Sequence, residues 1–167
     1  RDCSWSRGLG DEYKRQVMAR MGHVCCLHKH YELRDLVSYY TERNLSVLQY
    51  VWYSMGMKAT EFVKLKQIYT DSGLQPNICI DVANGYSEGF VDFCRMVRKD
   101  FKKSIIMAGN VATPEMVQEL ILHGGVDIVK VGIGPGSACA TRLKTGVGYP
   151  QLSAIDECVH ACLLYTS

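Results

Sequence analysis

The stretch NICIDVANGYSEGFVDFCRMVRKDFKKSIIMAGNV, residues 77–111, contains one complete strand–helix–strand unit. Two short apolar runs, 77–83 and 104–111, enclose a segment with helical periodicity. The apolar residues of that segment, which fall at offsets of three, four, seven and eleven, are Phe90, Phe93, Cys94, Val97 and Phe101. Those offsets place them on one face of a helix. The stretch therefore predicts two strands of a parallel sheet joined by a helix.

The same alternation continues on both sides of this unit. Further β-prone runs are HVCCLH (23–28), NLSVLQYV (44–51) and VDIVKVGIG (126–134), while TPEMVQELILHGG (113–125) has a helical pattern. In this helix Thr113 is a good N-cap, Pro114 suits the first turn, and Gly124 can close the C-terminus. The strands are apolar nearly throughout, as expected when both faces are covered. The sequence thus predicts an α/β protein, either an open doubly wound sheet or a (β/α)8 barrel.

Polar, glycine-containing segments follow the predicted strands. They are HKHY (28–31), YSMGM (53–57), DVANGYS (81–87), GNVAT (109–113) and GIGPGSACATR (132–142). In both candidate architectures ligands bind at the carboxyl ends of the strands. We therefore expect these segments to gather on one face and to form the functional site.

Composition excludes several classes of protein. The 167 residues are 47% hydrophobic and 22% charged, and the formal net charge is +2. This charge is too small to indicate nucleic-acid binding or a polybasic membrane patch, and no apolar run is long enough to span a membrane. The eight cysteines form no Cys-x-x-Cys pair. With no recognisable signal peptide, we expect reduced cysteines in a cytoplasmic protein, with Cys25, Cys26, Cys79 and Cys94 buried.

The two ends of the chain do not fit the pattern. The sequence opens with Arg1 and closes with CLLYTS. We expect residues 1–22 to be an uncertain or non-native segment, 23–161 to be part of a barrel domain, and 162–167 to be an artefactual tail. On this interpretation the chain is incomplete.

Cys139 is the candidate reactive group, because it lies in the glycine-rich loop GIGPGSACATR. A thiolate there could attack an electrophilic carbon, and Thr141, two residues on, could relay a proton. A metal ligand and a cysteine incidental to a tight turn are the alternatives from the residues alone. The glycine spacing does not follow the dinucleotide-binding fingerprint. His28 and His30 could suggest a metal, but two histidines without a third ligand are more often structural.

The segments DVANGYSE, IMAGNVAT and KVGIGPGSACATRLKTGVGYPQLSA resemble the IMP dehydrogenase/GMP reductase family, and its GMP reductase branch in particular. The resemblance implies a partial (β/α)8 TIM barrel with roughly strands two to six. It also implies NADPH-dependent conversion of GMP to IMP and ammonia through a cysteine thioimidate, with a potassium ion and a cytoplasmic homotetramer. The alternatives are IMP dehydrogenase, which oxidises IMP with NAD, and a non-catalytic nucleotide-binding homologue.

The resemblance also implies roles for individual residues. Cys139 matches the nucleophile and Thr141 its proton-handling partner. The positions that match cofactor-binding residues are Lys29, Asp81, Val82, Ala83, Ile133 and Gly134. The potassium ion is implied to bind at Gly134, Gly136, Cys139 and Arg142. For two of these residues a simpler interpretation exists, since Asp81 could cap a turn and Lys29 could be a solvated surface lysine. The family's later glutamate and phosphate-binding loops have no counterpart in this sequence, so we expect this chain alone to be inactive.

Overall fold

A computed structural model describes residues 17–42 and 45–163. The strands are β1 (Cys25–Leu27), β2 (Val51–Met55), β3 (Asn77–Asp81), β4 (Ile106–Val111) and β5 (Ile128–Val131). The helices are α2 (Leu33–Glu42), α3 (Leu45–Leu48), α4 (Ala59–Ser72), α5 (Phe90–Asp100), α6 (Pro114–Leu122), α7 (Thr141–Thr145) and α8 (Gln151–Leu163). Of the expected terminal segments, residues 1–16 and 164–167 lie outside the described residues, and α8 continues two residues into the expected tail.

The five strands form one parallel sheet in which spatial order follows sequence order, β1-β2-β3-β4-β5. Doubly wound sheets reverse their strand order at a switch point, whereas each strand of a (β/α)8 barrel lies beside the next one in sequence. The sequential order therefore selects the barrel. Because β1 and β5 each have one neighbour among the described residues, the sheet is not closed. The structure is a partial barrel, as predicted.

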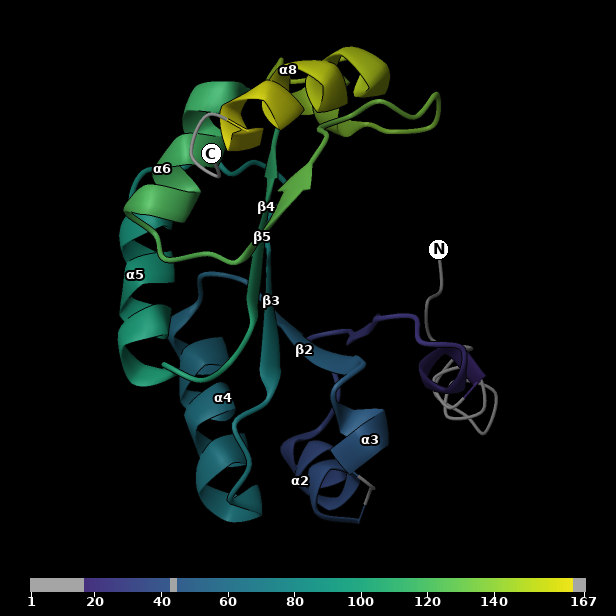
Figure 1. Ribbon diagram of the computed structural model, residues 1–167, viewed down its shortest axis with the longest axis vertical. Coiled ribbons are helices and arrows are strands. Elements are labelled where there is room, and N and C mark those ends of the chain that lie inside the picture. The colour runs from purple at the N-terminus through teal and green to yellow at the C-terminus, as the bar shows by residue number, and fades with distance from the viewer. Residues whose placement is uncertain (1–16, 43–44, 164–167) are drawn as a thin grey trace.

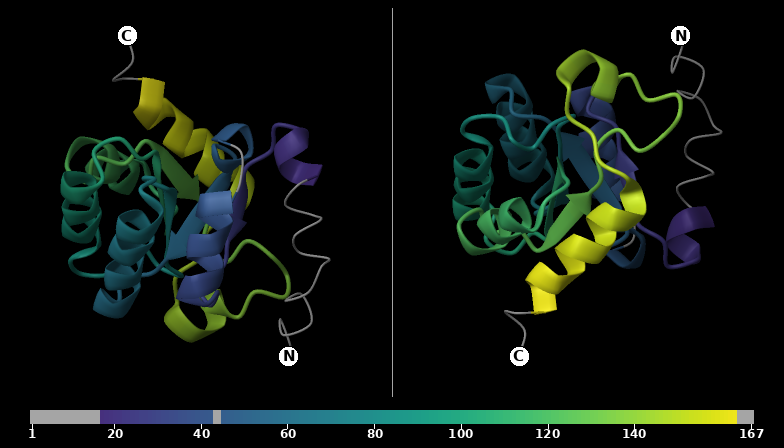
Figure 2. Two further views of the ribbon diagram at one scale, coloured as in Figure 1. Left: turned by 90° about the horizontal axis from the view of Figure 1, so that it is seen from below. Right: turned by 90° about the horizontal axis from the view of Figure 1, so that it is seen from above.

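The helices α4, α5 and α6 line one face of this sheet (Figure 1). The two end-on views show the sheet between these helices and the loop that leads from β5 to α7 (Figure 2). Alternation within the strands explains this arrangement, because successive side chains of a strand point to opposite faces. In β3, Ile78 and Ile80 are fully buried in the core that includes the helices, while Cys79 and Asp81 line a pocket on the other face.

Helix α5 confirms the predicted amphipathic face. Phe90, Cys94 and Val97 are at most 1% exposed, and Phe101, which ends the helix, is buried as well. The Phe101 ring makes edge-on contacts with aromatic rings of α4, so the end of α5 is anchored to the neighbouring helix. Burying a large aromatic side chain contributes about 2–3 kcal/mol.

The prediction of a strand over 44–51 was wrong. Residues Leu45–Leu48 form α3, and the strand β2 instead covers Val51–Met55, which overlaps the segment expected to be a loop. Between these elements the carbonyl of Gln49 accepts hydrogen bonds from the Trp52 indole and the Asn77 amide, each 3.2 Å long. These contacts hold the turn at Gln49 that precedes β2.

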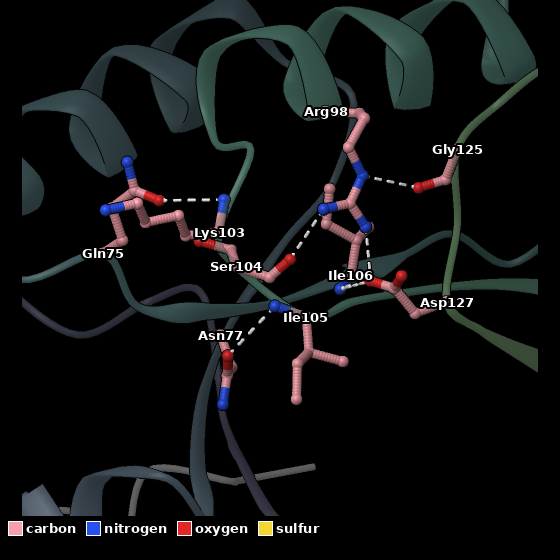
Figure 3. Close-up of polar contacts among 9 residues, drawn as sticks. All are labelled: Gln75, Asn77, Arg98, Lys103, Ser104, Ile105, Ile106, Gly125 and Asp127. Atoms are coloured by element: carbon pink, nitrogen blue, oxygen red, sulfur yellow. Dashed lines mark hydrogen bonds and ion pairs between the residues drawn. The ribbon is translucent and has the colours of Figure 1, made fainter.

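A polar network joins the amino ends of β4 and β5 to α5 (Figure 3). The Arg98 guanidinium donates to the carbonyl oxygens of Gly125 (2.7 Å) and Ser104 (2.8 Å) and pairs with the Asp127 carboxylate. The same carboxylate accepts the backbone N–H of Ile106 at 2.8 Å. One arginine thus connects the helix, the start of β4 and the turn before β5, at the end of the sheet opposite the expected site.

Candidate functional site

A pocket of about 390 Å³ lies on the sheet face opposite α4, α5 and α6. Met55, Asp81 and the segment 28–30 form part of its lining, and every strand contributes an inward side chain, namely Cys26, Ser54, Cys79, Met107 and Lys130. Since these residues alternate with the core residues of the same strands, the pocket is the inner face of the partial barrel. Of the five predicted strand-end segments, 28–31, 53–57 and 81–87 contribute residues to this lining.

An ion pair between Lys130 and Asp81 spans the pocket from β5 to β3. It passes over β4 next to Gly109, where an added Cβ would lie 2.5 Å from the Lys130 carbonyl oxygen. The absence of a side chain at position 109 therefore allows Lys130 to approach. The Lys130 side chain is 27% exposed and that of Asp81 is 56% exposed, so the carboxylate remains open to solvent and to a ligand.

Helix α4 holds Lys29 at the edge of the pocket. The Glu61 carboxylate accepts the backbone N–H of Gly56 and lies 3.8 Å from the Lys29 ammonium. Lys64 donates hydrogen bonds to the carbonyl oxygens of Lys29 and Tyr31. Burial lowers the pKa of Lys64, which is opposed by nearby glutamates. Glu61 and Lys64 thus fix both the side chain and the backbone of the segment that carries Lys29.

The two histidines beside Lys29 have structural contacts. The ring of His28 stacks on that of Tyr31 with centroids 4.1 Å apart, and its Nδ1 accepts the backbone N–H of His30 at 3.2 Å. Within residues 17–42 and 45–163, no group of three or more His, Cys, Asp or Glu side chains could hold a metal ion.

Cys139 lies near the end of the loop after β5, two residues before Thr141, which is the first residue of α7. The hydroxyl and the backbone N–H of Thr141 hydrogen-bond the thiol and lower the pKa of Cys139. Desolvation opposes this shift, and the Arg142 guanidinium adds to it. The Cys139 amide donates to the Gly136 carbonyl at 3.1 Å and closes the turn. A thiol held in this way ionises more readily than an ordinary cysteine, as a nucleophile requires.

The first residues of this loop are fixed by hydrogen bonds to their surroundings. Gly132 donates to the Val111 carbonyl (2.7 Å), and its own carbonyl accepts the Asn110 amide (2.8 Å). The Ile133 carbonyl accepts the Tyr149 amide at 3.0 Å. Gly132 and Gly134 have φ values of 124° and 61°, which are unfavourable for other residues. The loop therefore leaves β5 in a defined direction.

The structure divides the expected site residues into two groups. Lys29 and Asp81 line the pocket, and Val82 follows Asp81 with its amide and carbonyl bonded to the end of β4; Ala83 is exposed. The residues of the β5 loop form the second group. Ile133 is 2% exposed and Gly134 is buried at its start, while Gly136, Cys139, Thr141 and Arg142 lie further along.

Sequence reasoning missed Lys130 and Glu61. A charged residue inside the apolar run VDIVKVGIG is the signal that could have identified Lys130, because a lysine in a covered strand needs a partner. Glu61 had no such signal, since an acidic residue in the first turn of a helix is common. The expectation of buried thiols was correct for Cys79 and Cys94 but wrong for Cys25, which is half-buried, and for Cys26, which faces the pocket and is exposed.

A family model described as the IMP dehydrogenase / GMP reductase domain matches residues 48–166. A GMP reductase of Tolumonas auensis is 51% identical over 146 residues, which are 87% of this chain and 42% of that protein. For Edwardsiella ictaluri GMP reductase the identity is 52% with the same coverage, and for Buchnera aphidicola GMP reductase it is 49% over 92% of this chain. The chain spans less than half of the length of these curated relatives.

Among solved structures, GMP reductase from Trypanosoma brucei in complex with guanosine 5'-triphosphate has a similar fold. The TM-score is 0.61 and the sequence identity 31%, over 68% of this chain and 27% of that one. In the described parts of the chain, no helix has both the length and the apolar character that a membrane crossing requires.

Proposed function

This chain belongs to the IMP dehydrogenase / GMP reductase family, and from that premise we propose that it carries part of the active site of a GMP reductase. The reaction is the NADPH-dependent conversion of GMP to IMP and ammonia. The observation that supports it most is the hydrogen-bonded pair of Cys139 and Thr141, which provides an ionisable thiol with a hydroxyl beside it. The curated relatives described above are GMP reductases at about half identity.

The Cys139 thiolate is the nucleophile in this proposal. Its sulfur adds to C2 of the guanine ring, the bond from C2 to the exocyclic nitrogen breaks, and ammonia leaves, so that a thioimidate remains. The Thr141 hydroxyl, which donates to the thiolate before attack, relays a proton toward the departing amine. Covalent catalysis of this kind replaces one difficult substitution by two easier steps. When bound, NADPH supplies the hydride that replaces the sulfur at C2 and completes IMP.

The pocket residues have the chemistry that a dinucleotide needs. The exposed carboxylate of Asp81 can accept hydrogen bonds from ribose hydroxyls, and the ammonium groups of Lys29 and Lys130 suit phosphate oxygens. Val82 and Ala83 would border the cofactor at the end of β3. Ile133 and Gly134 would meet it from the β5 loop, through backbone rather than through the buried Ile133 side chain.

Potassium fits the donors that the β5 loop offers. The carbonyl oxygens of Gly134, Gly136 and Cys139, together with that of Arg142, are neutral oxygen donors of the kind that hard monovalent cations accept. The Gly136 carbonyl already accepts the Cys139 amide, but a carbonyl oxygen has a second lone pair. A cation there would hold the loop that carries the nucleophile.

The test uses a chimera in which this chain replaces the matching part of Edwardsiella ictaluri GMP reductase. We expect GMP-dependent oxidation of NADPH, loss of turnover in Cys139→Ala, and a large decrease in kcat in Thr141→Ala. This chain alone is expected to be inactive. A folded chimera that reduces NAD with IMP would assign the chain to IMP dehydrogenase. A folded chimera that binds GMP without turnover or thioimidate would indicate a non-catalytic homologue.

Assembly as a homotetramer and location in the cytoplasm remain predictions from the resemblance. Light scattering coupled to size-exclusion chromatography of the same chimera tests the first, and imaging of the tagged protein in its own cell tests the second. A monomeric, active chimera would contradict the tetramer.

A further inference from the structure

Two thiols lie together on the floor of the pocket, and no step of the proposed reaction uses them. Cys26 belongs to β1 and Cys79 to β3, the two strands that flank β2. Both side chains line the pocket, Cys26 being exposed and Cys79 2% exposed. A side-chain hydrogen bond joins them.

The curvature of the sheet explains this contact. In a flat sheet, alternate strands lie roughly 9.6 Å apart, which is twice the spacing of neighbours. Cys26 pairs with Trp52 and Cys79 with Ser54, so the two residues are also offset along the strands, and in a flat sheet their side chains would not meet. When a sheet curves into a barrel, the side chains of its inner face converge. A disulfide needs Cα atoms within about 7 Å. Strand β1 has three residues and pairs only with β2 in the described residues, so the inward movement that bond formation requires would disturb only a short run of strand pairing.

The surroundings favour one thiolate and one thiol in this pair. The hydrogen bond with Cys26 is the main cause that lowers the pKa of Cys79 to about 7, and the nearby Lys130 ammonium and Ser54 hydroxyl act in the same direction. Burial and the Asp81 carboxylate oppose them. The same pairing, together with desolvation, raises the pKa of Cys26. Near neutral pH the pair therefore holds a nucleophilic sulfur next to a protonated one, which is the arrangement that thiol oxidation uses.

We propose that Cys26 and Cys79 form a reversible disulfide when the chain meets a peroxide. The Cys79 thiolate attacks one peroxide oxygen, the O–O bond breaks, and a sulfenic acid forms while the second oxygen leaves as hydroxide and takes up a proton. The Cys26 thiol then loses its proton, its sulfur attacks the Cys79 sulfur, the S–O bond breaks, and water leaves. The two thiols are oxidised by two electrons in total, and hydrogen peroxide is reduced to two waters. A dithiol reductant restores both thiols.

The resulting bond would tie the edge strand β1 to β3 directly beneath Asp81 and Lys130. The two cysteines are therefore a modification site within the pocket, and this site does not involve the Cys139 nucleophile. Its test does not depend on the proposed GMP reductase activity, because the readout is a covalent link.

The experiment uses the full 167-residue chain carrying Cys139→Ser, so that the loop thiol does not consume the oxidant. The reduced protein is treated with hydrogen peroxide, remaining thiols are alkylated, and non-reduced tryptic peptides are analysed by mass spectrometry. We expect peptide 21–29 to be linked to peptide 67–95 and to be released by dithiothreitol. Because the first peptide also contains Cys25, Cys25→Ser is the matched control and should keep the link, whereas Cys26→Ser should abolish it.

A second measurement guards against a variant that fails to fold. The same oxidation in concentrated urea should decrease the specific link at least tenfold, because only the folded sheet brings the two thiols together. Cys94, in the same peptide as Cys79, has its pKa raised to about 12 by burial and should remain alkylatable after denaturation. A link that persists in Cys26→Ser, or peroxide-treated chain in which Cys26 and Cys79 both remain alkylatable, would overturn the proposal.

Discussion

Removing the Arg98 side chain should destabilise the chain strongly, because this residue joins three parts of the fold. Its guanidinium donates to the carbonyls of Gly125 and Ser104 and pairs with Asp127 (Figure 3). Ser104 is 3% exposed, so water cannot readily replace the lost donor at its carbonyl. We expect Arg98→Ala to lower the free energy of unfolding by about 3 kcal/mol.

Most of this expected loss in the free energy of unfolding comes from the two hydrogen bonds that Arg98 donates to carbonyl oxygens. A hydrogen bond from a charged donor contributes about 1.5 kcal/mol net, and a buried acceptor left unpaired costs at least as much. The ion pair contributes little, since the Asp127 side chain is 47% exposed and solvent screens such pairs to below about 1 kcal/mol. Asp127 also keeps its hydrogen bond from the Ile106 amide.

Urea denaturation followed by far-UV circular dichroism measures the effect, provided that the variants share one m-value. Arg98→Lys keeps the charge but cannot reach all three acceptors, so it should lose about 2 kcal/mol. Arg95→Ala is the matched control on the same helix, because Arg95 donates to one carbonyl, that of His123, and pairs with an exposed aspartate. It should cost about 1 kcal/mol. If Arg98→Ala costs no more than Arg95→Ala, the network does not act as described.

Two further predictions concern the β5 loop. Thr141→Val should shift the pH profile of Cys139 alkylation by iodoacetamide to higher pH, since the hydroxyl that stabilises the thiolate is lost; an unchanged profile would show that the hydrogen bond has no effect. Gly132→Ala should destabilise the chain by about 2 kcal/mol, because a φ of 124° is strained for alanine. The new Cβ would also lie 2.1 Å from the Gln151 side chain. Gly136→Ala, with no atom within 4 Å of the new Cβ, is the control in the same urea assay and should be close to neutral.

The strand–helix alternation was readable from the sequence because each signal is local. The apolar face of α5 and the N-terminal boundary of α6 at Thr113 and Pro114 depend on residues within a few positions of one another. The prediction of a strand over 44–51 was wrong because α3, which lies there, is only four residues long and is too short to show a helical period. The position of β2 is set by pairing with β1 and β3, which the local sequence does not contain. Likewise Gly125, and not Gly124, has the positive φ after α6.

The candidate site, too, was predictable only where its residues are close in the sequence. Cys139 and Thr141 are two residues apart, so their proximity follows from the sequence. Lys130 and Asp81 are 49 positions apart and meet only because the sheet places β3 and β5 on either side of a glycine in β4. The contact between Cys26 and Cys79 depends on the curvature of the sheet, which no periodic pattern in the sequence indicates. Long-range pairs of this kind require the folded sheet.

The sequential strand order also determines how the chain can assemble during synthesis. Each strand pairs with the strand that precedes it in the sequence, so every pairing closes a loop of only one strand–helix unit. Closing a loop of one unit costs less chain entropy than closing a loop that spans several units. The nascent sheet can therefore extend one unit at a time from an edge that already exists. In such an addition process the Lys130–Asp81 ion pair can form only after β4 has paired with β3 and β5 has paired with β4. Its formation would therefore indicate that these three strands are in register.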